Sequence, residues 1–366
     1  MANFYKTLNQ SNDIINTRTL LHEAIPLTGT IVSGTYGVEN IKDYSHGMFQ
    51  SVYDYPYLSS SANHIFDITT GYAATSPLVN AANNQNTKKQ NIYNQMAQVL
   101  MGYDATGNIL EFDQDGDLLA GGIKQRENIF FNFSRLLVKD EIKKGSFEME
   151  LGIGNGYSQQ GAVFASRIKL ADTNGATSFL VNSPVGEYGV LFATQSAGTN
   201  VLAANQSYPV GLLFYQAGVA VVSSSVFLRA STGGILNNLH NNVSMSGPSN
   251  TVETFNAVLT GSLINGAANN VRTRLFNLQF NNTVELNSSV YFCRANASEF
   301  NYSSNPTYLS GSKIRVKTKT TDLPVSYITT VGLYNDNNEL MAVSKLSEPL
   351  KKTPDNEFTI RVRLDY

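Results

Sequence analysis

The most regular pattern of hydrophobic and polar positions lies near the carboxyl end of the chain. Two runs rich in β-branched and aromatic residues, 327–334 and 339–344, flank four consecutive Asn and Asp residues at 335–338. Asn and Asp tolerate positive φ and hydrogen-bond their own backbone, so this spacing predicts a β-hairpin. Gly332, inside the first run, indicates a bulge or a close backbone approach.

A third strand is predicted at the carboxyl end itself. Between residues 358 and 366, apolar side chains alternate with Arg and Asp, which is typical of a half-buried strand. Residues 346–354 would form the crossing between the hairpin and this strand. We therefore expect residues 324–366 to form one compact β unit, packed on a preceding hairpin.

The middle of the chain also has a residue pattern typical of strands separated by turns. The predicted strands cover residues 146–152, 166–170, 188–194 and 210–227, and a hairpin joins 271–280 to 283–292 around Asn281 and Asn282. The apolar run 210–222 is interrupted by glycine, so it is interpreted as part of two buried strands that meet at Gly218. Near the amino end, residues 28–36 are β-branched and bounded by glycine, and a strand is predicted there.

Helical periodicity is confined to a few segments. Residues 86–101 place Ile92, Met96, Val99 and Leu100 on one face, with Gly102 as the stop. A second helix is predicted over residues 128–142, where Phe130, Phe133 and Leu137 share a face. A short third helix is predicted over residues 252–264.

These elements predict a mainly β protein of the α+β class, built from antiparallel, sandwich-like β units with a few short helices near residues 86–142 and 252–264. Changes along the chain in the predicted mix of helices and strands indicate three regions. They are a mixed α/β region at 1–145, a β-rich domain at 146–270 and a carboxyl-terminal β domain at 271–366.

Composition narrows the classes of function. Of 366 residues, 42% are hydrophobic but only 15% are charged, and the net charge is −2. This balance lacks the basic footprint of a protein that binds nucleic acid or anionic lipid. A surface with few charges does little to keep copies apart, which suits a subunit covered by neighbours. The single cysteine, Cys293, forms no internal disulfide, and no apolar run is long enough for a membrane helix.

One cluster of carboxylates is a candidate cation site: Glu111, Asp113, Asp115 and Asp117, with Gly116 among them. Several oxygens and a sharp turn are what Ca²⁺ requires. In an EF-hand register, however, the twelfth position is Gly122, where a bidentate glutamate is needed. We therefore favour an acidic hairpin turn over a calcium site. The histidines have no ligand spacing, no nucleophile or phosphate-binding motif is present, and no cofactor is expected.

Aromatic side chains supply candidates for interaction surfaces. Tyr53, Tyr55 and Tyr57 form a cluster that suits either an interface or a buried aromatic group. On the carboxyl-terminal strands the interface candidates are Tyr327, Leu333, Tyr334, Leu364 and Tyr366.

Several stretches resemble known phage sequences. The run YITTVGLYNDNNELMAVSK (327–345) is similar to the hairpin in tail-fibre attachment domains and baseplate-associated proteins of contractile-tailed phages. Four further runs resemble one family of virion structural proteins of large contractile-tailed phages (myoviruses): LHEAIP (21–26), HGMFQSVYDYPY (46–57), LLVKDEIKKGSF (136–147) and FCRAN (292–296).

This resemblance implies a non-enzymatic structural protein of a bacteriophage virion, located in the contractile tail and associated with the baseplate. It would be assembled in the host cytoplasm as a homo-oligomer, with itself and other virion proteins as partners. Two alternatives stay open. One is a host-receptor or carbohydrate-binding module of the tail, in which tyrosines stack on a host-surface glycan. The other is a head or neck decoration or collar protein.

Overall fold

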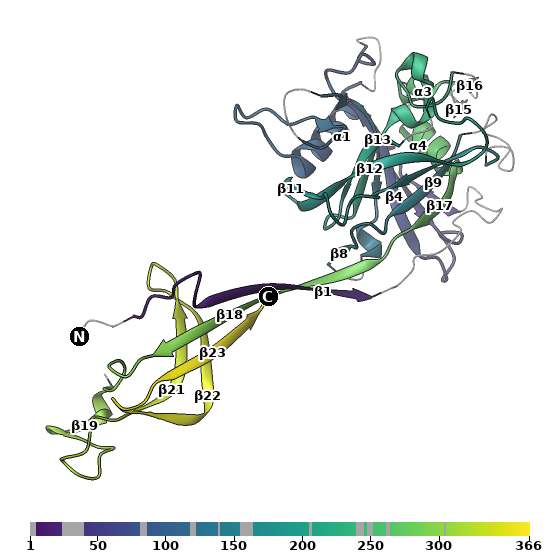
Figure 1. Cartoon of the computed structure of the whole chain (residues 1–366). Coiled ribbons are helices and arrows are strands. Elements are labelled where there is room, and N and C mark those ends of the chain that lie inside the picture. Colours follow the sequence, from purple (N-terminus) through teal and green to yellow (C-terminus); the bar gives the residue numbers. More distant parts are fainter. Residues whose placement is uncertain are drawn as a thin grey trace. The chain divides into compact units, whose positions relative to one another are not determined.

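The computed structural model describes residues 5–23, 40–80, 86–117, 122–137, 140–153, 164–204, 207–238, 245–246, 252–260, 264–303 and 305–366. The chain divides into two compact units (Figure 1). The small unit combines Met1–Leu20 with Glu285–Tyr366, and the large unit is Leu21–Val284. The strand predicted at 28–36 lies outside the described residues.

The large unit is organised by one antiparallel sheet of eleven strands. Its order is β17 (Leu275–Gln279), β9 (Glu148–Gly152), β10 (Arg167–Ala171), β12 (Gly186–Ala197), β13 (Tyr208–Phe214), β14 (Val219–Ser223), β7 (Glu127–Asn132), β4 (His64–Tyr72), β3 (Gln50–Tyr53) and β2 (Ile41–Asp43), with β11 (Leu180–Ser183) paired to β12. Strands from both sides of residue 145, where the sequence predicted a boundary between regions, belong to this one sheet. The division into two units therefore differs from the three predicted regions. The predicted class, mainly β with antiparallel sheets and a few short helices, is confirmed.

The helix predicted over residues 128–142 is wrong. That segment contains β7, a 3-10 turn η2 (Ser134–Leu136) and the short strand β8 (Glu141–Ile142). In β7, Ile129 and Phe131 belong to one hydrophobic cluster while Phe130 belongs to the other, so the strand is buried on both faces. A strand buried on both faces reads as a continuous apolar run, and its aromatic spacing also matches one face of a helix.

The helix predicted over residues 86–101 is confirmed as α1 (Asn86–Leu100), and Gly102 ends it with a φ of +81°. Its buried side chains include Ile92, Tyr93 and Leu100, but Val99, predicted to face the core, is 57% exposed. The helix lies close to β4 (Figure 1), and a Cβ on Gly71 would come within 2.7 Å of the backbone oxygen of Lys89. Glycine is therefore required there by close approach of strand and helix.

Further helices are α3 (Phe255–Thr260), inside the predicted segment 252–264, and α4 (Ile264–Thr273). Among the predicted strands, 146–152, 166–170 and 188–194 correspond to β9, β10 and β12. The apolar run 210–222 is part of β13 and β14, which meet around Gly218 at a φ of +63°. The remaining short elements are β5 (Phe112–Asp113), β6 (Lys124–Gln125), β15 (Met245–Ser246), β16 (Val252–Glu253), η3 (Ser224–Phe227) and η4 (Ala230–Thr232).

The hairpin predicted between residues 271–280 and 283–292 is wrong. Residues up to Thr273 are helical, and β17 pairs with β9, where Leu275 lies opposite Leu151 and Leu278 opposite Met149. These four side chains belong to the same buried cluster. Burial of apolar surface against a distant strand thus prevails over pairing with the adjacent one.

The small unit contains most of β1 (Ile14–Glu23), most of β18 (Asn282–Ala295) and all of β23 (Phe358–Asp365), in the order β1-β18-β23 (Figure 1). The first residues of β18 belong to the large unit, where Asn282 and Thr283 pair with β8. The predicted carboxyl-terminal strand is therefore present, but it pairs with β18 and makes no ladder with the hairpin. Short elements of this unit are η5 (Pro306–Tyr308), β19 (Leu309–Ser310) and β20 (Lys313–Ile314).

The predicted hairpin is confirmed as β21 (Ser326–Tyr334) and β22 (Leu340–Lys352), paired with each other. Its turn is held by Asn335, whose Oδ1 accepts from the backbone N–H groups of Asn337 and Glu339 at 3.0 and 2.8 Å, and Asn338 has a φ of +61°. The crossing predicted at 346–354 is wrong up to Lys352, because β22 continues through it.

The base of the hairpin is anchored by polar contacts. Lys352 is buried, and its Nζ donates to the backbone oxygens of Ala297 and Thr353 and to Asn301 Oδ1 at 2.8–3.1 Å. Tyr308 donates from its hydroxyl to the backbone oxygen of Val325. Three oxygens around one ammonium compensate for its desolvation.

Candidate functional site

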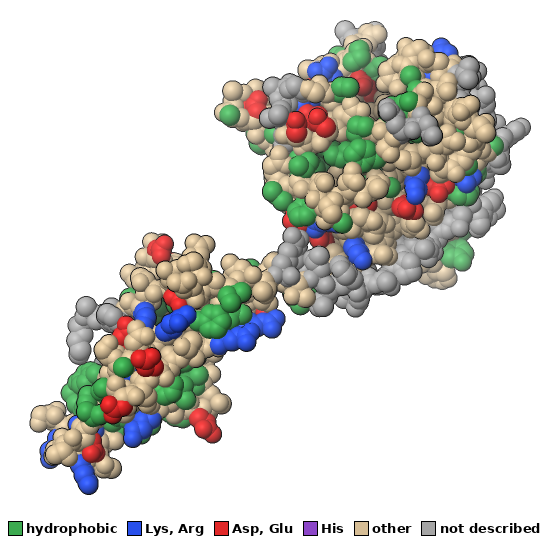
Figure 2. Space-filling model, viewed as in Figure 1, with side chains coloured by type: hydrophobic (Ala, Val, Ile, Leu, Met, Phe, Trp, Pro, Cys, Tyr) green, Lys and Arg blue, Asp and Glu red, His purple; other side chains and the backbone are tan. Residues whose placement is uncertain are grey.

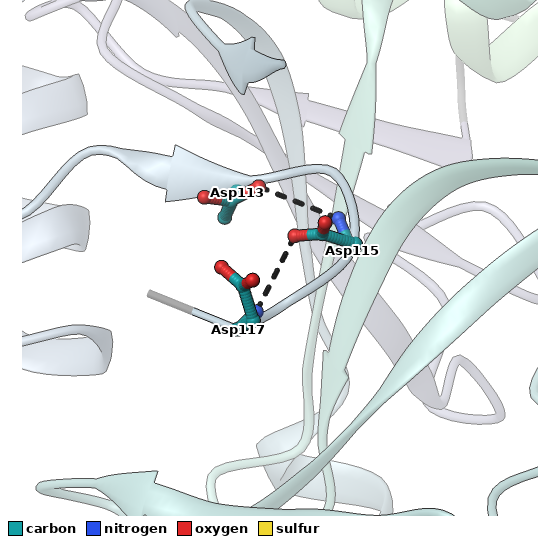
Figure 3. Close-up of side chains that lie close together, drawn as sticks. All are labelled: Asp113, Asp115 and Asp117. Carbon is teal, nitrogen blue, oxygen red and sulfur yellow. Dashed lines mark hydrogen bonds between the residues drawn. The ribbon is translucent and has the colours of Figure 1, made fainter. Parts of the chain in front are cut away.

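The acidic turn predicted as a candidate cation site lies between β5 and β6. Asp113, Asp115 and Asp117 are carried by one loop and face one another (Figure 3), with carboxylate oxygens within 4.8 Å of one another. Asp113 is buried, whereas Asp115 and Asp117 are exposed. The loop is closed by backbone donation from Asp115 N–H to Asp113 Oδ1 and from Asp117 N–H to Asp115 Oδ1, both at 3.4 Å.

Glycine and tyrosine fix the position of this loop on the sheet. Gly116 has a φ of +76°, and a Cβ there would meet the Leu180 side chain at 2.7 Å. Tyr188 donates from its hydroxyl to the Gly116 backbone oxygen at 2.8 Å and to Asn182 Oδ1 at 2.6 Å. Burial raises the pKa of Tyr188 to about 12, so the hydroxyl keeps its proton as a donor.

The charges of the turn are already compensated in part by neighbouring side chains. Lys124 forms an ion pair with the buried Asp113 carboxylate. Glu111 stands apart from the three aspartates: it accepts from Arg126 Nε at 3.2 Å and from the Thr75 hydroxyl. Gly122, the twelfth residue of the EF-hand register, would carry its Cβ 3.3 Å from Asp113 Oδ1. It approaches the carboxylate but supplies no ligand, so the geometry favours a structural acidic turn.

The tyrosine candidates of the large unit lie on β3 and the loop that follows it. Tyr53 is half-buried and packs edge-on against His64 with ring centroids 5.4 Å apart. Tyr57 lies 6.3 Å from Tyr53, and Tyr55 is 57% exposed. The cluster is thus partly a packed aromatic group and partly a surface.

The other candidates belong to the small unit. Tyr327, Tyr334 and Tyr366 are exposed, while Leu333 and Leu364 are half-buried. Tyr334 packs against Tyr5 with ring centroids 4.7 Å apart. Figure 2 shows hydrophobic side chains at the surface of the small unit, alongside charged ones.

The large unit contains a pocket that the sequence did not predict. It has a volume of about 450 Å³ and is lined by β6, the end of β14, η3 and α3, with Gln125, Asn256 and three serines, 223–225, in its wall. Its residues come from distant parts of the chain and match no motif. The buried ionic groups were missed for the same reason: Lys144 pairs with Glu141 at 2.8 Å and with Glu187 at 2.5 Å.

No family model, curated protein or solved structure matched this chain. Among the described residues, no helix is both long and apolar enough to cross a membrane.

Proposed function

We propose that the chain is a non-enzymatic structural subunit of a contractile-tailed phage particle, located at the tail or baseplate. It assembles in the host cytoplasm with copies of itself and with neighbouring virion proteins. The resemblance of several segments to phage virion proteins motivates the proposal. The surface of the small unit is the observation that carries it.

In the described part of the small unit, few apolar side chains are buried. The buried ones are Val290, Ala295, Tyr308, Val325 and Val362, and both large hydrophobic clusters consist of large-unit residues. Near the hairpin turn, Leu340, Met341 and Val343 are 54%, 68% and 60% exposed. A small domain normally covers such residues, so this surface fits a subunit that completes its core by association.

The hairpin is also a sheet of only two strands among the described residues. Isolated hairpins are marginal in water, and unpaired strand edges add readily to a neighbour's sheet. Polar contacts hold its base at Lys352, and hydrogen bonds of Asn335 hold its turn, which lowers the conformational entropy lost on docking. Burying the exposed half of each apolar side chain contributes about 1 kcal/mol.

Sedimentation velocity of the purified full-length chain tests self-assembly. We expect an oligomer, and Val343→Lys should raise its dissociation constant at least about tenfold by placing a charge in the buried contact. Val99→Lys is the matched control, because Val99 is equally exposed but lies on α1 of the large unit. A monomeric chain, or equal effects of both substitutions, would contradict assembly through the hairpin.

The place in the particle needs a separate measurement. Purified virions separated into heads and tails, each analysed by mass spectrometry, should contain the chain in the tail fraction as repeated copies. Recovery with the heads or neck would favour the decoration or collar alternative. Absence from virions would refute a structural role altogether.

A further inference from the structure

The pocket in the large unit contains polar groups that have no hydrogen-bond partner among the residues that the structure describes. Gln125 is buried, and neither its side-chain oxygen nor its side-chain nitrogen has a hydrogen-bond partner. Asn256, across the pocket on α3, has an unpartnered and buried Oδ1. A buried amide without partners costs stability, so three such atoms at one pocket indicate groups retained for a ligand.

The charged residues that line the same pocket are already paired. Lys124 contacts Asp113, Arg126 donates to Glu111 at 3.2 Å, and Glu127 accepts from the Ser76 hydroxyl. An ionic ligand would have to displace these contacts. The hydrogen-bonding groups that are left for a ligand are therefore uncharged. They are the side-chain amide of Gln125, which can donate and accept, and Asn256 Oδ1, which can accept.

The remaining wall supports the same chemistry. Serines 223–225 and Thr232 contribute hydroxyl-bearing side chains, while Leu228 and Ile235 supply apolar surface. A volume of about 450 Å³ lies in the range of small-molecule sites. Adjacent hydroxyl groups on a ring each donate and accept, which complements a side-chain amide, and the C–H faces of such a ring suit the apolar wall.

From these observations we propose that this pocket binds a neutral, hydroxyl-rich ring compound, a mono- or disaccharide, with Gln125 and Asn256 as its hydrogen-bonding anchors. The site lies entirely within the large unit, and the inference does not depend on assembly through the hairpin of the small unit.

Saturation-transfer NMR on the full-length chain tests the proposal with glucose, galactose, mannose, N-acetylglucosamine, maltose and lactose as probes. We expect at least one of them to bind with a dissociation constant in the millimolar range or tighter. Citrate and inorganic phosphate should not displace it, because the charged groups of the pocket are already paired.

Substitutions identify the site. Gln125→Leu and Asn256→Leu should each weaken binding at least about tenfold, while Gln98→Leu on the exposed face of α1 should leave it unchanged. Gln125→Leu should not lower the melting temperature, because it removes an unpartnered buried amide. The proposal is overturned if none of the six sugars binds, if binding survives both pocket substitutions, or if the anions displace the sugar.

Discussion

Asp172 offers a sharp test of how burial and charge are balanced in the large unit. It follows β10 and is buried, and its two carboxylate oxygens accept from the backbone N–H groups of Gly145 at 2.6 Å and Phe147 at 3.0 Å. Desolvation by burial outweighs these hydrogen bonds and raises the pKa of Asp172 to about 6 from an ordinary value of 3.8.

The direction of the pH dependence follows from this raised pKa. The folded state binds the proton more tightly than the unfolded chain, so the stabilisation is fully present below pH 3.8. It is lost as the pH rises through about 6. A shift of about two pKa units corresponds to about 3 kcal/mol.

The measurement is urea denaturation of the wild type and of Asp172→Asn between pH 4 and pH 7. Asn keeps the size of the side chain but does not titrate. We expect the stability advantage of the wild type over the variant to be about 2 kcal/mol larger at pH 4 than at pH 7, because the unfolded carboxyl is already partly ionised at pH 4. Asp104→Asn is the control: hydrogen bonds from Thr106 and Asn108 lower the pKa of Asp104 to about 2, so its difference should stay flat in this window. A flat difference for Asp172 as well would refute the reasoning.

Three further outcomes are expected. Gly71→Ala should destabilise the large unit by about 1–3 kcal/mol in urea denaturation, because the added Cβ would meet the backbone oxygen of Lys89. Gly266→Ala is the control: the space around Gly266 is open, so this substitution should not destabilise the unit. Equal effects of the two substitutions would contradict the close approach of α1 and β4. Deleting residues 356–366 removes β23, the partner of β18, so the chain should aggregate in size-exclusion chromatography; a soluble, normally assembling product would show the strand to be dispensable. Adding Ca²⁺ should leave the melting temperature unchanged because Lys124 already neutralises Asp113; a rise that is abolished by Asp115→Ala would establish a cation site.

Local signals in the sequence predicted local structure well. The hairpin at 327–344 was found because Asn335 and its neighbours determine the turn within a few residues. Helix α1 was found because its periodicity and its stop at Gly102 are both local. The segment 128–142 was mistaken for a helix, since burial of β7 on both faces produces aromatic residues at helical spacing.

Non-local features could not be predicted in this way. Pairing of β17 with β9 depends on which distant apolar strand is available, and no local pattern encodes that choice. The three aspartates of the acidic turn were found from their spacing, but the ion pair of Asp113 with Lys124 brings together two strands of the folded loop. The pocket around Gln125 exists only once β6, η3 and α3 are assembled.

The pairing of β9 with β17 also has a consequence during synthesis, because β9 is made well before its partner strand. At usual rates of translation, β17 leaves the ribosome roughly ten seconds after β9. During that interval Met149 and Leu151 border an open strand edge whose partner does not yet exist. The delay is longer still for β1, because its partner β18 lies farther along the sequence from it than β17 lies from β9. A nascent chain of this protein must therefore stay soluble with unfinished edges, and its yield should respond to chaperone supply and to translation speed more than its final stability would suggest.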